Sequence, residues 1–435
     1  MSAVTRRSWI AGVSSVAILN SRPAPAASSE VLKAGLVGCG GRGTAAAVNL
    51  LTADPQVELV ALADVFPDKL SDSLRRLRDP QYLASNVKGA AAFLGKPPAD
   101  VADSVFRRVK VNPDAQFVGF DAYKKLLSAG VDLVLLATPP GYRPEHFEAV
   151  VNAGKHAFVE KPIATDPVGV RRFLASVQTA AQRKLSVVAG TQWMAQNERV
   201  ETVRKIQDGA IGDVVAIYAD YLSTPVMHAR ARDPQWGDME WQHRNWYSFL
   251  WICGDQIVEQ HIHGLNFCNW VMGTHPVRAV ASGGVAWRPE EELYGNIYDH
   301  LTADLVYPNG VRLASHCRQY PPKVTYSRVA EMVVGSKGRS NGRDLGSTPG
   351  MDPLVQEHIN LVRSIRGEGP YQNQGVQVAE STLTAIMARE AAYSGMEITW
   401  DMIFNSRQDL QPKAFDYKLP LPVPPRPVPG QYKFV

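Results

Sequence analysis

Short apolar runs alternate with amphipathic segments from residue 31 to residue 190. The runs VELVALAD (57–64) and VDLVLLAT (131–138) are almost continuously apolar, which is typical of parallel strands covered on both faces. The segments between such runs, for example 44–52 and 166–182, show helical periodicity, as the crossover connections of a parallel sheet require. The pattern predicts a doubly wound Rossmann sheet, the α/β part of the fold.

The sequence after Gly190 changes character. Its long runs alternate apolar and polar residues and are separated by turn sequences such as 308–310, which is typical of an antiparallel sheet. One amphipathic helix is expected over 254–271, and two helices at 353–366 and 377–394 are expected to close the domain. This half is predicted to be an α+β domain with a large, open, mostly antiparallel sheet. Its strands are expected at 213–221, 277–287, 301–307, 311–320 and 328–334.

The chain of 435 residues is too long for one compact core, and we expect two domains, at 31–190 and 191–405. Residues 406–435 form a proline-rich arm, expected to be extended and to lie over its own surface or embrace a second subunit. Residues 79–116 interrupt the alternation with a stretch rich in Ala, Gly and Pro. This stretch predicts an insertion, either a solvated loop or short extra helices.

Residues 1–26 resemble a twin-arginine signal peptide. Arg6 and Arg7 precede an apolar run of eleven residues and Ala24-Pro25-Ala26, a small-residue cleavage site. Eleven residues are too few to span a bilayer, so we expect export to the periplasm or medium, with no membrane insertion. The alternative is a chance arginine pair. Cleavage removes three arginines and no acid, which lowers the formal charge from +4 to +1 and leaves nucleic-acid binding without electrostatic support.

The loop Gly38-Cys39-Gly40-Gly41-Arg42-Gly43 follows an apolar strand and opens a helix. In this context Gly38 makes the turn, Gly40 lets the backbone approach a pyrophosphate, and Gly43 permits close contact between helix and strand. The helix N-terminus then faces the negative charge of the pyrophosphate. The pattern predicts a dinucleotide site, against the alternative of a glycine turn that binds nothing.

Asp64 ends the next apolar run, at a position suited to accept hydrogen bonds from the adenosine ribose hydroxyls. A carboxylate there repels a 2′-phosphate, which favours NAD over NADP as the cofactor. Lys69 and Arg42 are close enough in sequence to soften that preference. Later along the chain, Glu160-Lys161-Pro162 comes directly after a strand. Lys161 could bond a substrate hydroxyl and assist proton transfer, or form a surface ion pair before a turn proline.

The motifs in this half match, in order and spacing, those of one family. The chain resembles the Gfo/Idh/MocA oxidoreductases, named for glucose–fructose oxidoreductase and inositol dehydrogenase. The resemblance continues through 206–212 and 269–273 and covers nearly all of the chain except the signal peptide, the insertion and the arm. The matching motifs are Gly38–Gly43, Thr138-Pro139 with Pro144-x-His146, Gly154-Lys155-His156 and Glu160-Lys161-Pro162.

The resemblance implies roles for individual residues. Lys161 takes the place of the family's active-site lysine, and His263 that of the acid/base at the hydroxyl being oxidised. Glu259 and Asn266 stand where the family carries two aspartates, so one carboxylate is kept and one is lost. The family's arginine-rich stretch is replaced here by Gln192-Trp193-Met194, which leaves the usual substrate contacts in doubt. Thr138, Pro139, His146, Glu160 and Lys161 are expected beside the cofactor.

The segment Glu259-x-His261-x-His263 also permits a metal-binding interpretation. Residues two apart on a helix point in nearly opposite directions, so the two histidines cannot converge on one ion. We expect no metal site. The four cysteines are widely spread, with no CxxC pair, and are expected to be small buried apolar residues.

A sugar pocket is expected around residues 240–247, where tryptophans alternate with polar residues. Aromatic faces stack on sugar C–H surfaces, and amide and guanidinium groups bond the hydroxyls. An aromatic core segment is the alternative. A strand opening at Tyr298-Asp299-His300 could face the same cavity. The residues expected to bind substrate are Gln192, Gln242, Arg244, Asn245, Glu259, Asn266, Asp299 and His300.

Together these features predict an NAD-dependent oxidoreductase acting on a CH–OH group of a sugar, polyol or glycoside. Free NAD is scarce outside the cytoplasm, so an exported enzyme is expected to hold its cofactor tightly and recycle it. An enzyme that cleaves glycosides by oxidation and elimination, and a non-catalytic sugar or nucleotide sensor, are the alternatives. The open sheet and the proline arm favour a dimer or tetramer.

Overall fold

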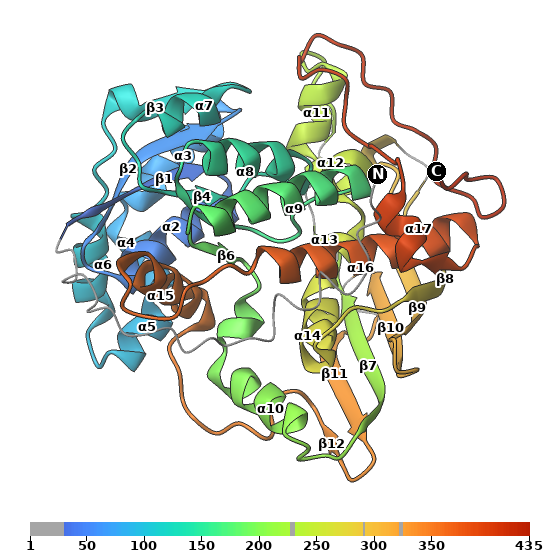
Figure 1. The fold of residues 1–435 in the computed structure, drawn as a ribbon. Helices are drawn as coiled ribbons and strands as arrows, with labels where there is room; N and C mark the ends of the chain where they lie inside the picture. The colour runs from blue at the N-terminus through green and yellow to red at the C-terminus, as the bar shows by residue number, and fades with distance from the viewer. Residues whose placement is uncertain (1–29, 227–230, 290–291, 322–324) are drawn as a thin grey trace.

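The computed structural model of the chain describes residues 30–226, 231–289, 292–321 and 325–435. It contains two sheets, and a long helix, α16 (Gly375–Ser394), runs between them (Figure 1). The expected signal peptide lies outside the described residues. Within those residues, no helix combines the length and the apolar character that crossing a membrane requires.

The first sheet is parallel throughout, with strand order β3-β2-β1-β4-β5-β6. The order reverses between β1 and β4, which is the switch point of a doubly wound sheet. Its central strand β4 is buried along its whole length, as its continuous apolar run predicts. The Rossmann fold is confirmed. The strands are β1 (Leu32–Val37), β2 (Val57–Asp64), β3 (Gln116–Val118), β4 (Leu133–Leu136), β5 (His156–Val159) and β6 (Val187–Ala189).

Helices cover both faces of this sheet (Figure 1). The insertion at 79–116 consists mainly of short helices, so the loop alternative is wrong. Leu83, Val101 and Val105 from the insertion are buried with residues of α2 and β2 in one apolar cluster. The helices are α2 (Gly41–Ala53), α3 (Pro67–Leu77), α4 (Pro80–Asn86), α5 (Lys88–Phe93), α6 (Pro98–Phe106), η1 (Pro113–Ala115), α7 (Ala122–Leu127), η2 (Pro140–Tyr142), α8 (Arg143–Asn152) and α9 (Pro167–Gln182).

The second sheet has strand order β12-β11-β7-β10-β9-β8-β13 and is antiparallel except for the β7–β10 pair. Burial alternates along β10, where Leu313, Ser315 and Cys317 are buried. The predicted mostly antiparallel sheet is confirmed. The strands are β7 (Val214–Ser223), β8 (Arg278–Gly284), β9 (His300–Val306), β10 (Arg312–Gln319), β11 (Arg328–Gly335), β12 (Arg339–Ser340) and β13 (Ile398–Thr399).

The two helices that follow this sheet in sequence occupy different places. α16 packs against β8 of the second sheet and against α9 of the first domain. α15 (Pro353–Arg366) packs on α2 and β6, and its Leu361 and Val362 join the core of the first sheet. The expectation that α15 closes the second domain is wrong. The sequence shows which face of an amphipathic helix is apolar, but not which sheet that face covers.

The single helix expected over 254–271 is wrong, because α13 (Gln256–Glu259) and α14 (Ile262–Met272) replace it. Asp255 precedes α13 with a φ of +83°. Its buried carboxylate accepts hydrogen bonds from Tyr298 N (3.0 Å) and Tyr393 OH. Partners far along the chain thus fix the start of α13. The remaining elements are η3 (Gln192–Ala195), α10 (Asn197–Gln207), α11 (Asp238–Arg244), η4 (Trp246–Ser248), α12 (Leu250–Cys253), η5 (Glu292–Tyr294) and α17 (Trp400–Asn405).

The proline-rich arm has no helix or strand. It lies over the surface of its own chain, which was one of the two placements expected for it. Leu421 N donates to the carboxylate of Asp238 (2.8 Å), at the start of α11. Tyr298 OH donates to the carbonyl of Pro427 (2.8 Å). Figure 1 shows the arm, in red, running beside α11. All four cysteines are buried and unpaired, as expected.

Candidate active site

A cavity of about 630 Å³ lies at the carboxyl ends of the parallel strands and extends to residues of the second domain. In a doubly wound sheet this is where ligands bind. The second domain contributes Trp246, Glu259 and His263 to its lining. The residues expected beside the cofactor all line it: Gly38, Gly40, Gly41, Arg42, Gly43, Asp64, Thr138, Pro139, His146, Glu160 and Lys161.

The glycine loop has the geometry that a dinucleotide requires. Gly38 has a φ of +96°, which favours glycine, and it makes the turn after β1. A Cβ added to Gly43 would collide with the carbonyl oxygen of Gly38, so this glycine permits the close approach of α2. A Cβ on Gly40 or Gly41 would meet nothing within 4 Å, although both residues line the cavity. The open space above them, at the N-terminus of α2, fits a pyrophosphate.

Two alanine substitutions should therefore fail for different reasons. Gly40→Ala places a methyl group in the open cradle, and we expect NADH affinity to fall about tenfold with little change in stability. Gly43→Ala forces α2 away from the loop and should cost about 1–3 kcal/mol of stability. NADH titration and urea denaturation of both variants check this. A Gly40→Ala variant that keeps full NADH affinity would show that the cradle faces no pyrophosphate.

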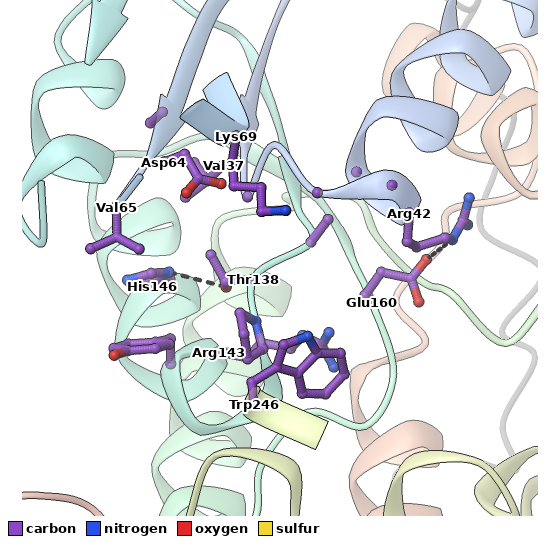
Figure 2. A pocket seen from close by; sticks show the side chains of 18 of the residues that line it. Val37, Arg42, Asp64, Val65, Lys69, Thr138, Arg143, His146, Glu160 and Trp246 are labelled. Atoms are coloured by element: carbon purple, nitrogen blue, oxygen red, sulfur yellow. Dashed lines mark hydrogen bonds and ion pairs between the residues drawn. The ribbon is translucent and has the colours of Figure 1, made fainter. Parts of the chain in front are cut away.

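Asp64 is held with both carboxylate oxygens engaged. Oδ2 accepts from Cys39 N (2.6 Å) and Oδ1 accepts from Phe66 N (2.8 Å). Burial raises the pKa of this carboxyl group. Figure 2 shows Lys69 beside Asp64, with its side chain in the cavity. These two residues are placed to meet a ribose at this end of the cavity.

Arg42 is committed to two carboxylates. Its Nε lies 2.5 Å from Glu160 Oε1, and its Nη2 lies 3.1 Å from Glu357 Oε1 of α15 (Figure 2 shows the first pair). The guanidinium of Arg42 is therefore held on one side of the cavity, and Asp64 and Lys69 lie on the other side. Of the two cations that could soften a preference for NAD, Arg42 is engaged elsewhere.

Thr138 and His146 form part of the cavity wall. Thr138 Oγ1 lies 3.3 Å from His146 Nδ1 (Figure 2). Burial, together with the positive charge of Arg143, lowers the pKa of His146 to about 3. The ring is stacked by Tyr142, with ring centroids 5.6 Å apart. His146 is therefore a neutral, fixed element of the wall at ordinary pH.

Lys161 is joined to the second domain by Glu259. Lys161 Nζ donates to Glu259 Oε1 (3.0 Å) and to the carbonyl oxygen of the same residue. Glu259 Oε2 accepts from Tyr247 OH (2.7 Å). Glu259 lines the cavity, but both of its carboxylate oxygens bind protein groups. Its placement makes it the residue that orients Lys161, in addition to any contact with a substrate.

His263 faces the same cavity from the second residue of α14. Its Nδ1 is buried, and neither ring nitrogen has a hydrogen-bond partner in the described part of the chain. Burial, followed by the charge of Lys161, lowers the pKa of this imidazole well below its usual value. His263 is therefore a neutral base with an unused lone pair. His261 points elsewhere, because its Nε2 lies 2.8 Å from Ser315 Oγ on β10.

Comparison with known proteins agrees with this geometry. A family model described as an oxidoreductase family with an NAD-binding Rossmann fold matches residues 32–191. The N-terminal domain belongs to the Gfo/Idh/MocA oxidoreductase family. Its cofactor is accordingly a nicotinamide dinucleotide, and the cradle above Gly40 and Gly41 fits one.

Three curated relatives match this chain over part of their own length. A glycosyl hydrolase family 109 protein of Streptomyces coelicolor is 30% identical over 28% of this chain and 27% of its own. An NADP-dependent scyllo-inositol 2-dehydrogenase of Bacillus subtilis is 27% identical over 44% of this chain and 48% of its own. A 1,5-anhydro-D-fructose reductase of Ensifer adhaerens is 23% identical over 59% of this chain and 68% of its own.

Solved structures are similar over most of the chain. The scyllo-inositol dehydrogenase of Lactobacillus casei, with NAD(H) and scyllo-inositol, has a TM-score of 0.61 at 17% identity and covers 85% of this chain and 99% of its own. The aldose–aldose oxidoreductase of Caulobacter crescentus has a TM-score of 0.58 at 16% identity, over 85% and 99% of the two chains. At these identities the similarity establishes the fold.

Two residues of the 240–247 segment lie outside the cavity. Gln242 accepts from Trp251 Nε1 (2.7 Å) and donates to the carbonyl of Leu421 in the arm. Asn245 is buried and donates to the carbonyl of Trp241 (3.1 Å). Neither lines the cavity, so their expected contact with a sugar is not supported. The amide of Gln242 joins α11 to Trp251 and to the arm, and the amide of Asn245 caps the carbonyl of Trp241 within α11.

Three other expected substrate residues also lie away from the cavity lining. Asn266 accepts from Ser381 Oγ (3.0 Å) on α16. Asp299 is buried and accepts from the backbone of Trp287 (3.0 Å), and His300 Nδ1 lies 2.8 Å from its carboxylate. These groups organise the second domain. Gln192 and Arg244 do line the cavity, with Arg244 at the end occupied by Asp64 and Lys69.

The sequence analysis missed part of the cavity wall. Phe66 and Phe120 line it, and so does Arg143, which is buried and donates to the carbonyl of Pro162. His243 and Trp246 also line it, and both belong to the segment 240–247 that was expected to form a pocket. Burial lowers the pKa of Arg143 to about 10. Phe66 follows β2 and Phe120 follows β3, so the rule that side chains after parallel strands meet at one edge could have found both. Nothing in the local sequence marks Arg143.

Proposed function

We propose that this protein is an NAD-dependent oxidoreductase that acts on a CH–OH group of a sugar, polyol or glycoside. The observation that carries the proposal is the cavity itself, which joins the dinucleotide loop to Lys161 and His263. A neutral histidine without a partner and a lysine oriented by a carboxylate are the groups that alcohol oxidation uses. The family of the N-terminal domain and the names of the curated relatives support the same class of reaction.

Each residue has a distinct part in this reaction. The glycine loop and the N-terminus of α2 would bind the pyrophosphate, and Asp64 would accept hydrogen bonds from the adenosine ribose. When bound, the nicotinamide supplies the acceptor for the hydride that leaves the substrate carbon. His263 would take the hydroxyl proton at Nε2, because its Nδ1 is buried. Lys161, held by Glu259, would donate a hydrogen bond to the same oxygen.

NAD is the proposed cofactor rather than NADP. Asp64 places a carboxylate where a 2′-phosphate would lie, and Arg42 is paired with Glu160 and Glu357. Lys69 and Arg244 are the other cations at that end, and Arg244 is paired with Asp68 and Glu240. A single lysine beside a carboxylate gives weaker recognition of a phosphate than an arginine fork.

We further propose that the protein is exported and retains its cofactor through many turnovers. The twin-arginine motif within residues 1–26 supports export, and a periplasmic or secreted enzyme has little free NAD to draw on. The cofactor would then be recycled, with oxidation and reduction in one catalytic cycle. The open second sheet supports a dimer or tetramer.

A second candidate is glycoside cleavage through transient oxidation. Oxidation at C3 acidifies the neighbouring C2–H, and loss of that proton expels the aglycone from C1. Water then adds to the resulting double bond, and the hydride returns to C3. The 30% identity, over 28% of this chain, to a protein named as a glycosyl hydrolase family 109 member is the observation that supports this candidate. It uses the same Lys161 and His263.

Product analysis on the purified holoprotein separates these candidates. Oxidation without cleavage should yield keto sugars, whereas oxidation–elimination should release the aglycone with no net change in cofactor redox state. A protein that binds NAD and sugar but forms neither product would be a sensor, which contradicts the proposal.

A further inference from the structure

The arm of this chain reaches the adenosine end of the cavity. The ring of Tyr417 is stacked on Phe66, with centroids 5.8 Å apart and an angle of 4° between the rings. It also lies 4.8 Å from the ring of Phe120 and 5.6 Å from that of His243. All three partners line the cavity. The arm therefore backs the wall that follows β2 and β3, next to Asp64.

Helix α11 crosses to the same place from the second domain. Arg244 lies 3.3 Å from Asp68 on α3, and its guanidinium covers the ring of Phe66 at 4.0 Å. On its own helix it pairs with Glu240 (3.0 Å). Arg244 thus ties the second domain to the first at the adenosine end, rather than reaching a sugar at the other end.

The arm is fastened where it makes this contact. Leu421 is held to α11 by Asp238 on one side and by Gln242 on the other. Gly237 passes so close to the carbonyl of Tyr417 that a Cβ there would collide with it. The position of Tyr417 is therefore set by the hydrogen bonds between Leu421 and α11 and by close packing against Gly237, just before α11.

Two buried polar atoms at this place have no partner in the described part of the chain: His243 Nδ1 and Tyr417 Oη. Buried polar groups are normally bonded, so these two need a ligand or water. The rings of Phe66 and Phe120, which line the cavity, lie beside them. A flat heteroaromatic group with its own donors and acceptors, such as adenine, fits this combination.

We propose that α11 and residues 415–417 of the arm form a clasp over the adenosine half of the dinucleotide, so that the cofactor leaves only when the clasp opens. The inference rests on the proposed function in assuming that the cavity holds a dinucleotide. The clasp would explain how the cofactor is retained. The adenosine end is closed by residues 415–417, which must separate from Phe66 and Phe120 before the cofactor can leave.

The test is the rate at which NADH leaves the holoprotein, followed by nicotinamide fluorescence after addition of excess NAD. Tyr417→Ala should release NADH about tenfold faster than the wild type, because a stacked ring is lost from the closed state. Asp68→Asn should also speed release. On electrostatics alone, removing a negative charge from this side of the cleft would slow the release of a negatively charged dinucleotide, so the sign separates the two explanations.

Leu419→Ala is the matched control, since Leu419 is on the same arm and 42% exposed. Its release rate should equal that of the wild type. The Asp68 side chain is 56% exposed on α3, so its substitution should leave folding intact, and the test survives a Tyr417→Ala variant that misfolds. ADP-ribose should bind Tyr417→Ala more weakly than the wild type, while nicotinamide mononucleotide binds both equally.

Unchanged NADH release in Tyr417→Ala and Asp68→Asn would overturn the clasp while leaving the proposed function intact. Equal weakening of both cofactor halves would also overturn it, because the arm would then act on the whole cleft. A wild-type protein that binds no NADH would instead refute the proposed function, and the clasp with it.

Discussion

His263→Gln should slow the oxidation of a bound sugar by about 10²–10⁴-fold, the usual range for loss of a general base. Glutamine keeps the size and polarity of the side chain but cannot accept a proton at neutral pH. NADH binding should be nearly unchanged, because the glycine loop and Asp64 belong to the other domain. Single-turnover reduction of bound cofactor measures the chemical step directly.

His261→Gln is the control, since His261 comes from the same segment but binds Ser315. It should keep the rate of the chemical step. The wild-type rate should also stay level as the pH falls through 6.5. An imidazole with an ordinary pKa would gain a proton there and lose its lone pair, whereas His263 has its pKa well below that value and stays neutral. A loss of rate centred near pH 6.5, or normal turnover in His263→Gln, would contradict its role as the base.

Arg389→Met should lower the stability of the fold by about 3–5 kcal/mol, the cost of breaking a buried ion pair from one side. Arg389 is fully buried and pairs with Glu390 (2.8 Å). It also donates to the carbonyls of Thr165 (2.7 Å) and Gly254 (3.0 Å) and to Gln408 (2.9 Å). Removing it leaves a buried carboxylate without its cation and two carbonyls without donors.

Urea denaturation of Arg389→Met measures this loss. Arg278→Met is the comparison, because the Arg278–Glu397 pair is nearly half exposed on both sides and should contribute less than about 1 kcal/mol. Since Gly254 comes just before α13, the Arg389 variant should also lose activity at temperatures where it is still folded. Equal stability of the two variants would show that Arg389 does not hold these segments together.

Much of the fold and of the cofactor site could be predicted from local sequence. β2 falls at its expected residues, and the glycine loop has the conformation its pattern implies. Lys161 was a candidate from its position after a strand, with a surface ion pair as the alternative, and the resemblance implied the roles of Lys161 and His263. The structure brings both to one cavity. Local patterns suffice where neighbours along the chain decide the conformation.

The errors share a different cause. Gln242 has the composition of a sugar-binding residue, but its partner Leu421 lies far along the chain, in the arm. The start of α13 depends on Asp255, whose carboxylate accepts hydrogen bonds from Tyr298 and Tyr393. α15 is placed by the core it joins. In each case the structure depends on a contact between residues far apart in the sequence, and the periodicity of a single sequence does not predict such contacts.

The most direct test of the proposed function is the absorbance of the nicotinamide in the purified holoprotein as sugars and glycosides are added. The protein should retain NAD through dialysis and release it only on denaturation. One or more sugars should then convert the bound cofactor to its reduced form, and His263→Gln should fail to do so with the same sugars. A purified protein that carries no dinucleotide and takes up none, or one whose bound NAD stays oxidised with every sugar and glycoside in the panel, would contradict the proposed function.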